Sequence, residues 1–337
     1  MRPTNIIVGD LIGQGSFGSV FQAQYEDQDK AKVDSALKIS QLGVPKKSYN
    51  VTDFLAWIRE VVLGRYLPKT DKRLQSAVLL PRYFSLSPSD TPTGLIDPSL
   101  LHGPLEDLLK KSRDWVGVSV SRRGGESLQQ WRRSRTPTAV LNVLKTVTEI
   151  VERLHAVGVA HQDLSLTNIL ITEDGEPELI DFGGAAFDRN NALVDARIQQ
   201  EFTNVLSLCG KYIRLARATR KTRQKPPTEV IQQMGGIRMH EGSIFLDTQH
   251  HMGLPAILDD AAAPPFSLHR RLDACQVAKL TLVAYLEDER WQVSGNHHEV
   301  TTGFSKVDGL IREVFLRRCT TTAVLRLIDS MLETLTA

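Results

Sequence analysis

The sequence predicts an α+β fold, with strands gathered near the amino terminus and helices dominating the remainder. Residues 6–21 read IIVGDLIGQGSFGSVF, where an alternating strand, a run of glycines and a second strand indicate a hairpin. Residues 140–154 instead repeat apolar side chains at helical spacing. Strands followed by helices are typical of α+β proteins, so we expect a small β-rich part and a larger helical part.

The composition is that of a globular protein. The 337 residues are 41% hydrophobic and 24% charged, enough for one large or two small domains, and the formal net charge of +2 indicates no particular partner. Three widely separated cysteines suggest neither a disulfide framework nor a zinc site, and they favour a reducing, cytoplasmic compartment. No apolar run approaches the ~20 residues that span a bilayer, and the start MRPTNIIVGD has no signal-peptide core.

Two polar clusters lie within apolar surroundings in residues 155–187. One is the run HQD ending at Asp163, followed by Asn168, and the other is DFG, beginning at Asp181. Between them, two short strands flank a turn-rich stretch, so a hairpin would hold these three side chains close together. Two carboxylates and an amide at one point suit a Mg²⁺–phosphate site, because Mg²⁺ takes hard oxygen ligands.

These clusters resemble the catalytic loop and the metal-binding DFG motif of protein kinases. Asn168 follows Asp163 by 5 residues and Asp181 follows it by 18, the spacing of that family. The resemblance implies a two-lobed protein-kinase-like fold. Its small lobe would hold a five-stranded antiparallel sheet and one helix, its large lobe would be mostly helical, and ATP would lie between them.

Other motifs of the family follow in the expected order. Gly13, Gly15 and Gly18 form G-x-G-x-x-G, and the β-like residues after them differ from the helix of a dinucleotide-binding fold. Such glycines let backbone N–H groups approach phosphates. Lys38, within a third strand at 35–40, resembles the phosphate-holding lysine, and Glu60 is its best partner, on a helix at 53–67 that should end before Pro68.

One position on this helix departs from the family pattern. The family places a bulky apolar residue four positions after the glutamate, where this chain has Gly64. Either Leu63 fills the resulting gap or the helix is less firmly docked.

The resemblance also divides the chain. We expect one kinase-like domain over 1–337, with an N-lobe at 1–121 and a C-lobe at 122–337. Strands are predicted at 78–86 and 115–120, around an insertion near 87–112 that has a short helix at 105–111. Thr136-Pro137 and Gly158 mark the ends of a long C-lobe helix, and 310–335 should supply the last two helices.

After the DFG motif the pattern weakens. Residues 195–216 form a predicted helix with Ile198, Phe202, Val205, Cys209 and Ile213 on one face. Residues 253–261 loosely resemble the end of an activation segment, which would then run from 181 to 261, with Ala261 and Leu254 replacing the family's glutamate and threonine. Asp273 then matches the buried aspartate that opens the next core helix, at 274–286. A rival alignment puts that helix at 198–213.

A basic run without an intervening acid overlaps this region and predicts an anionic partner, as an alternative to a solvated loop. It consists of Lys211, Arg214, Arg217, Arg220, Lys221, Arg223 and Lys225.

The resemblance implies transfer of the γ-phosphoryl group of ATP to a hydroxyl of a protein substrate. Asp163 would accept the hydroxyl proton, Asn168 and Asp181 would hold Mg²⁺, and Glu60 would position Lys38 on the α- and β-phosphates. Val20, Ala36 and Leu170 would enclose the adenine, which would bond to the backbone near Val120 to Arg122.

Two other function classes stay open. Ser165 stands where Ser/Thr kinases have lysine, so a small molecule is an alternative acceptor. Gly64 and Ala261 leave room for a pseudokinase that only binds partners.

Overall fold

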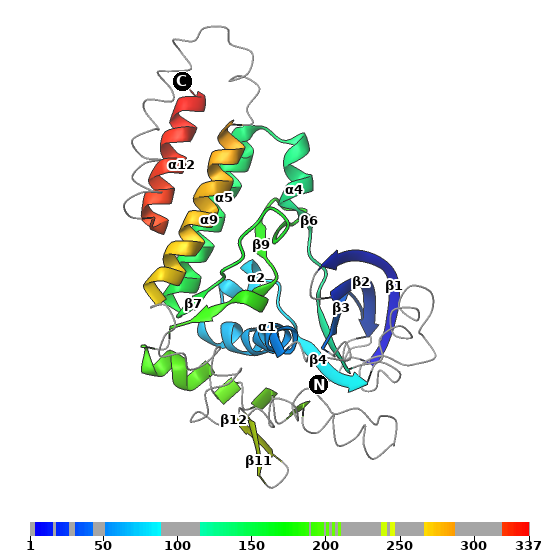
Figure 1. The fold of residues 1–337 in the computed structure, drawn as a ribbon. Coiled ribbons are helices and arrows are strands. Elements are labelled where there is room, and N and C mark those ends of the chain that lie inside the picture. Colours follow the sequence, from blue (N-terminus) through cyan, green and yellow to red (C-terminus); the bar gives the residue numbers. More distant parts are fainter. Residues whose placement is uncertain are drawn as a thin grey trace. The chain divides into compact units, whose positions relative to one another are not determined.

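The computed structural model describes residues 4–15, 18–26, 31–42, 51–88, 115–188, 190–198, 200–201, 204–205, 208–209, 237–240, 243–246, 266–286 and 319–336. They fall into two compact units (Figure 1). The first consists of Met1–Lys69, Leu79–Arg123 and Asp195–Ala263, and the second of Thr70–Val78, Gly124–Val194 and Pro264–Ala337.

The first unit contains the predicted five-stranded antiparallel sheet. Side chains of β2 alternate between buried and half-buried positions, whereas the first six residues of β5 are all buried, as expected for a strand covered on both faces. Apolar side chains of four strands form one core cluster on one face of the sheet. The strands are β1 (Thr4–Gly15), β2 (Gly18–Glu26), β3 (Lys32–Gln41), β4 (Tyr83–Pro88) and β5 (Trp115–Arg122), in the spatial order β1-β2-β3-β5-β4.

Helix α1 (Val51–Thr70) covers the other face of this sheet. Val116 and Val118 point into the core cluster, so the alternation of the strand turns Gly117 toward α1. There Trp57 packs so closely that a Cβ atom at position 117 would lie 2.5 Å from its ring. Glycine at 117 therefore lets the indole ring of Trp57 pack directly against the strand.

Two predicted boundaries in this unit are wrong. Helix α1 continues through Pro68 to Thr70, although the proline removes one N–H from the ladder, and the burial of Tyr66 and Leu67 just before it stabilises this last turn. The strand predicted at 78–86 begins at Tyr83. Val78 itself belongs to the second unit, where it forms a parallel bridge with Leu179 of the same unit.

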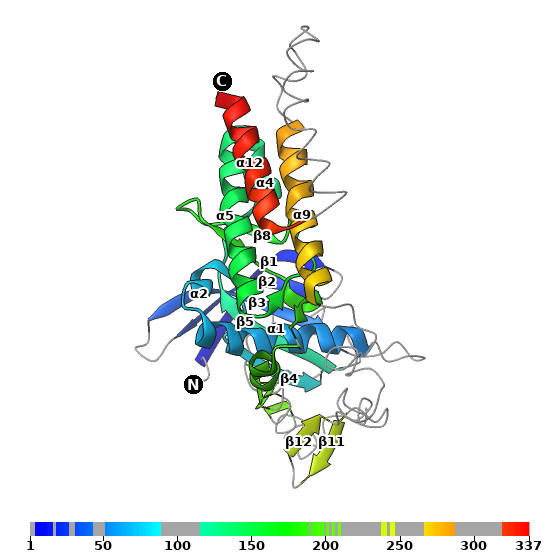
Figure 2. The ribbon, with the colours of Figure 1, turned by 90° about the vertical axis from the view of Figure 1, so that its left-hand side faces the viewer.

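Three long helices form the centre of the second unit: α5 (Pro137–Ala156), α9 (Phe266–Leu286) and α12 (Thr321–Thr336). They lie side by side, with α5 in contact with both others (Figure 2). The Thr136 hydroxyl caps α5 by accepting the Ala139 N–H at 3.2 Å, and Gly158 adopts φ +75° just beyond its end. Both ends predicted from the sequence are confirmed.

Short elements connect these helices. β6, β8 and β9 form one small antiparallel sheet, and β7 pairs with β10 in another. The β8–β9 pair is the predicted hairpin after the HQD cluster. These elements are α2 (Leu74–Ala77), β6 (Glu126–Ser127), α4 (Leu128–Trp131), the 3₁₀ turns Arg132–Ser134 and Phe182–Gly184, β7 (Val159–Ala160), β8 (Ile169–Ile171), β9 (Pro177–Leu179) and β10 (Ala186–Phe187).

Beyond the DFG motif the structure describes fewer residues. The described residues between 192 and 209 are helical apart from the gaps listed above, and β11 (Ile237–His240) pairs with β12 (Ser243–Leu246). Most of the predicted insertion at 87–112, with its short helix, lies outside the described residues. So do the basic run at 211–225 and the motif at 253–261. Within the described part of the chain, no helix has the length and apolar character needed to cross a membrane.

The α+β fold class predicted from the sequence is thus confirmed. Strands and α1 make up the described core of the first unit, and helices make up that of the second.

Candidate active site

The predicted site residues are divided between the two units. The glycines, Val20, Ala36, Lys38, Glu60 and Val120 belong to the first, and Asp163, Asn168, Leu170 and Asp181 to the second.

In the first unit, Lys38 and Glu60 form an ion pair. Leu37 and Ile39 are fully buried in β3, and Lys38 between them reaches Glu60 of α1, with Nζ 2.6 Å from Oε1. The Lys38 side chain is 22% exposed and that of Glu60 only 7%. A carboxylate this buried needs its cation, so the pair fixes which face of α1 meets β3.

Gly64 leaves no gap beside Glu60. A Cβ atom at Gly64 would collide with the backbone carbonyl of Pro81, which lies directly against the helix, and Leu63 next to it is fully buried. The bulky residue of the family pattern would not fit at this point. The Pro81 backbone thus occupies the space beside Gly64, and the Lys38–Glu60 pair forms without the bulky apolar side chain of the family pattern.

The three glycines lie at the end of the β1–β2 hairpin. Gly13 pairs with Val20, and Gly15 pairs with Gly18. Gly18 has φ +152° and passes so near the Ile39 carbonyl that a side chain would clash. Only glycine combines that backbone conformation with that close approach.

The predicted adenine contacts of the first unit cluster on the adjoining strands. Val20 lies opposite Lys38, and Ala36 opposite Ser121. The Val120 side chain is fully buried in the core cluster, and its carbonyl oxygen accepts the Arg82 N–H at 2.8 Å. A carbonyl oxygen has two lone pairs, so the Val120 oxygen can still accept a second hydrogen bond, from a donor other than Arg82.

In the second unit, Asp163 and Asn168 are joined directly. The Asn168 Nδ2 atom donates to both the backbone oxygen and the Oδ2 of Asp163, each at 2.9 Å. Asp163 is exposed, so its carboxylate is held in one orientation while it faces solvent. An amide that donates through Nδ2 presents Oδ1 as its acceptor, which is the atom that Mg²⁺ would need.

The β8–β9 hairpin brings Asp181 to the same loop. The Ile180 N–H donates to the Asn168 carbonyl at 3.0 Å, and the Ile180 carbonyl lies 2.9 Å from His161 Nε2. Asp181 itself adopts φ 64°. Gln162, with φ 72°, is the other non-glycine residue with positive φ in the described part of the chain. Such strained positions concentrate at functional sites.

His161 is a buried, neutral link between the two clusters. Its Nδ1 accepts the Asp163 N–H at 3.2 Å, so Nε2 carries the proton and donates to Ile180. Burial lowers the pKa of His161, although Asp273, the Ile180 carbonyl, Asp163 and Asp181 oppose the shift. Its ring packs on Phe182 at 4.4 Å between centroids.

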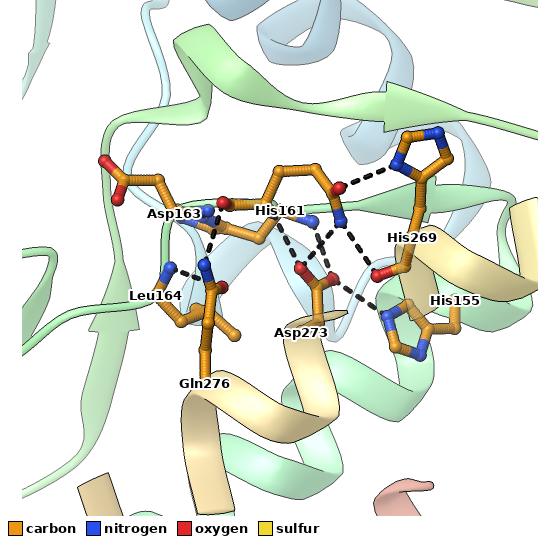
Figure 3. Close-up of polar contacts among 8 residues, drawn as sticks. His155, His161, Asp163, Leu164, His269, Asp273 and Gln276 are labelled. Atoms are coloured by element: carbon orange, nitrogen blue, oxygen red, sulfur yellow. Dashed lines mark hydrogen bonds and ion pairs between the residues drawn. The ribbon is translucent and has the colours of Figure 1, made fainter. Parts of the chain in front are cut away.

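Asp273 of α9 anchors the loop from below (Figure 3). Fully buried, it accepts the backbone N–H groups of His161 and Gln162, at 2.8 and 2.7 Å, and lies 2.9 Å from His155 Nε2. Asp273 is thus a buried aspartate of a core helix, as expected, but the predicted start of that helix is wrong: α9 begins at Phe266, so Asp273 lies within the helix and does not open it. The described residues near 198–209 lie in the first unit, against the rival placement of that helix.

Gln162 points into the same network. Its Nε2 donates to the His269 carbonyl at 2.8 Å and to Asp273 Oδ1 at 3.0 Å, and its Oε1 lies 2.6 Å from His269 Nδ1. Gln276 bonds the Gln162 carbonyl and the Leu164 N–H, each at 2.9 Å.

Neither His269 nor Gln276 was expected at the site. Their spacing from Asp273 is a signal in the sequence, because His269, Asp273 and Gln276 stand at i, i+4 and i+7 and so share one face of a helix.

Comparisons with known proteins agree with this arrangement. The model of the protein tyrosine and serine/threonine kinase family matches residues 6–200. Ribosomal protein S6 kinase 2 alpha of Xenopus laevis is 40% identical over 87 residues, which cover 24% of this chain and 12% of that protein. Serine/threonine-protein kinase ppk11 of Schizosaccharomyces pombe is 28% identical over 176 residues, covering 51% and 44%.

Serine/threonine-protein kinase 16 of Rattus norvegicus is 33% identical over 78 residues, covering 22% of this chain and 26% of that kinase. The chain therefore spans less than half the length of each of these relatives. The family match, by contrast, covers more than half of the chain itself. With the glycine hairpin, the Lys38–Glu60 pair and the Asp163 loop in the order of a kinase domain, the chain belongs to the protein tyrosine and serine/threonine kinase family.

Proposed function

We propose that the chain is an ATP-dependent protein kinase that phosphorylates serine or threonine hydroxyls. The observation that carries the proposal is the Asp163 carboxylate, which is exposed yet fixed by Asn168 Nδ2 at 2.9 Å. A general base must face its substrate and keep its orientation. The names of the relatives, all serine/threonine or S6 kinases, support the same acceptor.

In the proposed reaction the acceptor oxygen attacks the γ-phosphorus of ATP. The bond between that phosphorus and the β,γ-bridging oxygen breaks, and ADP leaves. Asp163 takes the proton of the acceptor hydroxyl. Lys38, oriented by Glu60, contacts the α- and β-phosphates, and backbone N–H groups near Gly13, Gly15 and Gly18 cover them. Asn168 and Asp181 would hold Mg²⁺, which supplies positive charge to the phosphates. Val20, Ala36, Val120 and Leu170 would contact the adenine.

We propose the same domain organisation as above: one kinase-like domain over 1–337, with lobes at 1–121 and 122–337 and an activation segment from 181 to 261. The position of Asp273 beneath the catalytic loop supports it. The three cysteines are free, which supports a reducing intracellular compartment.

A small-molecule acceptor is the second candidate. Ser165 has an uncharged partner, the Thr167 hydroxyl at 3.0 Å, where Ser/Thr kinases place a lysine against the transferred phosphate. Without that cation, the site lacks the contact by which Ser/Thr kinases hold the transferred phosphate.

Labelled ATP with Mg²⁺, mixed protein substrates and metabolite pools would test both proposals. We expect label to enter protein, and Asp163→Asn to lower turnover by about 10²–10⁴-fold while keeping ATP affinity. Asp174→Asn, which removes an exposed carboxylate from the β8–β9 turn, is the matched control and should match wild type. Label only in metabolites would favour the second candidate, and wild-type turnover in folded Asp163→Asn would exclude Asp163 as the base.

We also propose that the basic run at 211–225 binds an anionic partner, such as an acidic protein substrate. Exposed charges are screened over ~8 Å at physiological ionic strength, so binding should weaken with salt. Changing Arg217, Arg220, Lys221 and Arg223 to Ser should raise the KM of the substrate and leave ATP affinity unchanged. Equal behaviour of that variant and wild type from low to high salt would reduce the run to a solvated loop.

A further inference from the structure

A buried carboxylate lies outside the catalytic set, in the helical residues 192–209 that follow the DFG motif. Glu201 is 6% exposed and shares a helix face with Ile198, Val205 and Cys209, which are all buried. These positions are spaced i, i+3, i+7 and i+11, so Glu201 is the charged member of an apolar stripe. A charge in such a position is costly unless it is paired.

The two cationic partners of Glu201 come from helix α1, and Asn204 on its own helix adds a longer hydrogen bond from Nδ2 to Oε2 at 3.5 Å. Arg65 Nε donates to Oε2 at 2.8 Å, and Lys69 Nζ donates to Oε1. Both cations are partly exposed, whereas the carboxylate is not. Burial raises the pKa of Glu201, but the hydrogen bonds and charges of Lys69 and Arg65 outweigh it and leave the pKa below its ordinary value. Glu201 is therefore an anion fixed against α1.

The position of these contacts on α1 is informative. At ~100° per residue, Arg65 and Lys69 project ~140–180° away from Glu60 around the helix. Helix α1 is thus held on one side by Lys38–Glu60 and on nearly the opposite side by Glu201. Rotating Glu60 away from Lys38 would pull both cations off a buried carboxylate, which would then be left unpaired.

We propose that Glu201 is a positioning residue that keeps α1 rotated so that Glu60 meets Lys38. This inference rests on the proposed kinase function. The device needs no added phosphate, because the carboxylate is supplied by the chain itself. The residue that fixes the rotation of α1 would therefore lie in the helical residues 192–209, which follow the DFG motif.

The test replaces the carboxylate without changing its shape. Glu201→Gln should lower kcat/KM for ATP about tenfold, the size of a coupling between residues in contact. It should also speed hydrogen exchange of α1 amides. Asp34→Asn, which alters an exposed carboxylate of the same unit, is the matched control and should match wild type.

A double-mutant cycle separates positioning from simple structural support. In a Glu60→Gln background, Glu201→Gln should have little further effect on kcat/KM, because the contact it would preserve is already lost. Additive losses in the two backgrounds would overturn the proposal. If Glu201→Gln folds poorly, the double variant Arg65→Gln with Lys69→Gln provides the same test, because it alters only partly exposed side chains. It should show the same loss in kcat/KM and the same faster exchange of α1 amides.

Nucleotide affinity, measured with a fluorescent ATP analogue, distinguishes the two proposals. If wild type transfers no phosphate, the kinase proposal fails, whereas weaker analogue binding in Glu201→Gln alone would still support positioning through Lys38. If wild type is active and Glu201→Gln matches it in rate, affinity and hydrogen exchange, the positioning role is refuted.

Discussion

The catalytic loop and helix α1 are held in place by different kinds of contacts. In the loop, Asp273 accepts two backbone N–H groups, of His161 and Gln162. On α1, the contacts with Lys38 and Glu201 join side chains only. Backbone donors are fixed by the course of the chain, whereas Lys, Arg and Glu side chains lose rotamer freedom when they pair.

The two kinds of contact predict different consequences when each region is altered. A backbone-anchored loop moves only when the surrounding fold opens, so damage to it should appear as lost stability. The ion pairs of α1 can be lost while its buried apolar side chains keep the unit folded, so damage to these pairs should appear as lost activity. The following predictions test that division.

The largest effect should come from Asp273→Asn. Each Asp273 oxygen faces two N–H groups, so an amide NH₂ in either position would meet donors and leave them buried without a partner. We expect a loss of about 3–5 kcal/mol in the free energy of unfolding, measured by urea denaturation. Asp329→Asn, in the exposed pair with Lys145, is the control and should have little effect. Equal stability of the two variants would contradict the loop anchor.

Lys38→Arg, at the ion pair between β3 and helix α1, should lower activity without lowering stability. Arginine keeps the charge opposite Glu60 but places it differently, so we expect turnover to fall about 100-fold with an unchanged melting temperature. Steady-state rates and thermal unfolding measure both quantities. Lys32→Met, at the exposed start of the same strand, should leave both unchanged. A fall in melting temperature matching that of Asp273→Asn would place Lys38 among the structural anchors.

His161 should make the loop sensitive to acid. Its folded pKa is lowered, so below about pH 6.5 the unfolded chain takes up a proton that the folded chain does not. Stability should therefore decline as pH falls, by up to ~1.4 kcal/mol per pH unit from this group. Urea denaturation between pH 7.5 and 5.5 checks this, with His161→Asn as the variant that lacks the titration. An equal slope in both proteins would show that His161 does not carry the effect.

Gln162→Leu should have a smaller effect, because it removes side-chain bonds but keeps the backbone N–H on Asp273. We expect a loss of about 1–3 kcal/mol in unfolding free energy, since the partners on α9 lose their hydrogen bonds. The exposed Gln129→Leu serves as the control. A gain in stability would mean that the Gln162 network is strained rather than stabilising.

Dephosphorylation should have no effect on the rate. In many kinases an arginine at the position of Gln162 pairs with a phosphate on the activation segment. Here a neutral amide, already bonded to His269 and Asp273, cannot supply that charge. Phosphatase-treated enzyme should keep its turnover, as checked by mass spectrometry and rate assays on one sample. A loss that rephosphorylation restores would contradict this.

Much of the fold followed from local patterns in the sequence. Strand alternation in β2, glycine spacing in the β1–β2 hairpin and the Thr136 cap of α5 depend on neighbouring residues, and each is confirmed. The same holds for the β8–β9 hairpin, because its turn formers and apolar strands lie within 13 residues of one another. The spacing of the family motifs also predicts the pairing of Lys38 with Glu60, and the two side chains do form an ion pair.

Contacts between distant segments required the tertiary structure. The Pro81 carbonyl against Gly64, the Gln162 bonds to His269 and the two cations on Glu201 join residues 17 to 136 positions apart. The sequence shows that Glu201 interrupts an apolar stripe, which indicates a buried carboxylate. It does not show which cations pair with that carboxylate. Only the packing of that stripe beside α1 decides that Arg65 and Lys69 neutralise it, because the strength of a charge pair depends on distance and desolvation, which the order of residues does not contain.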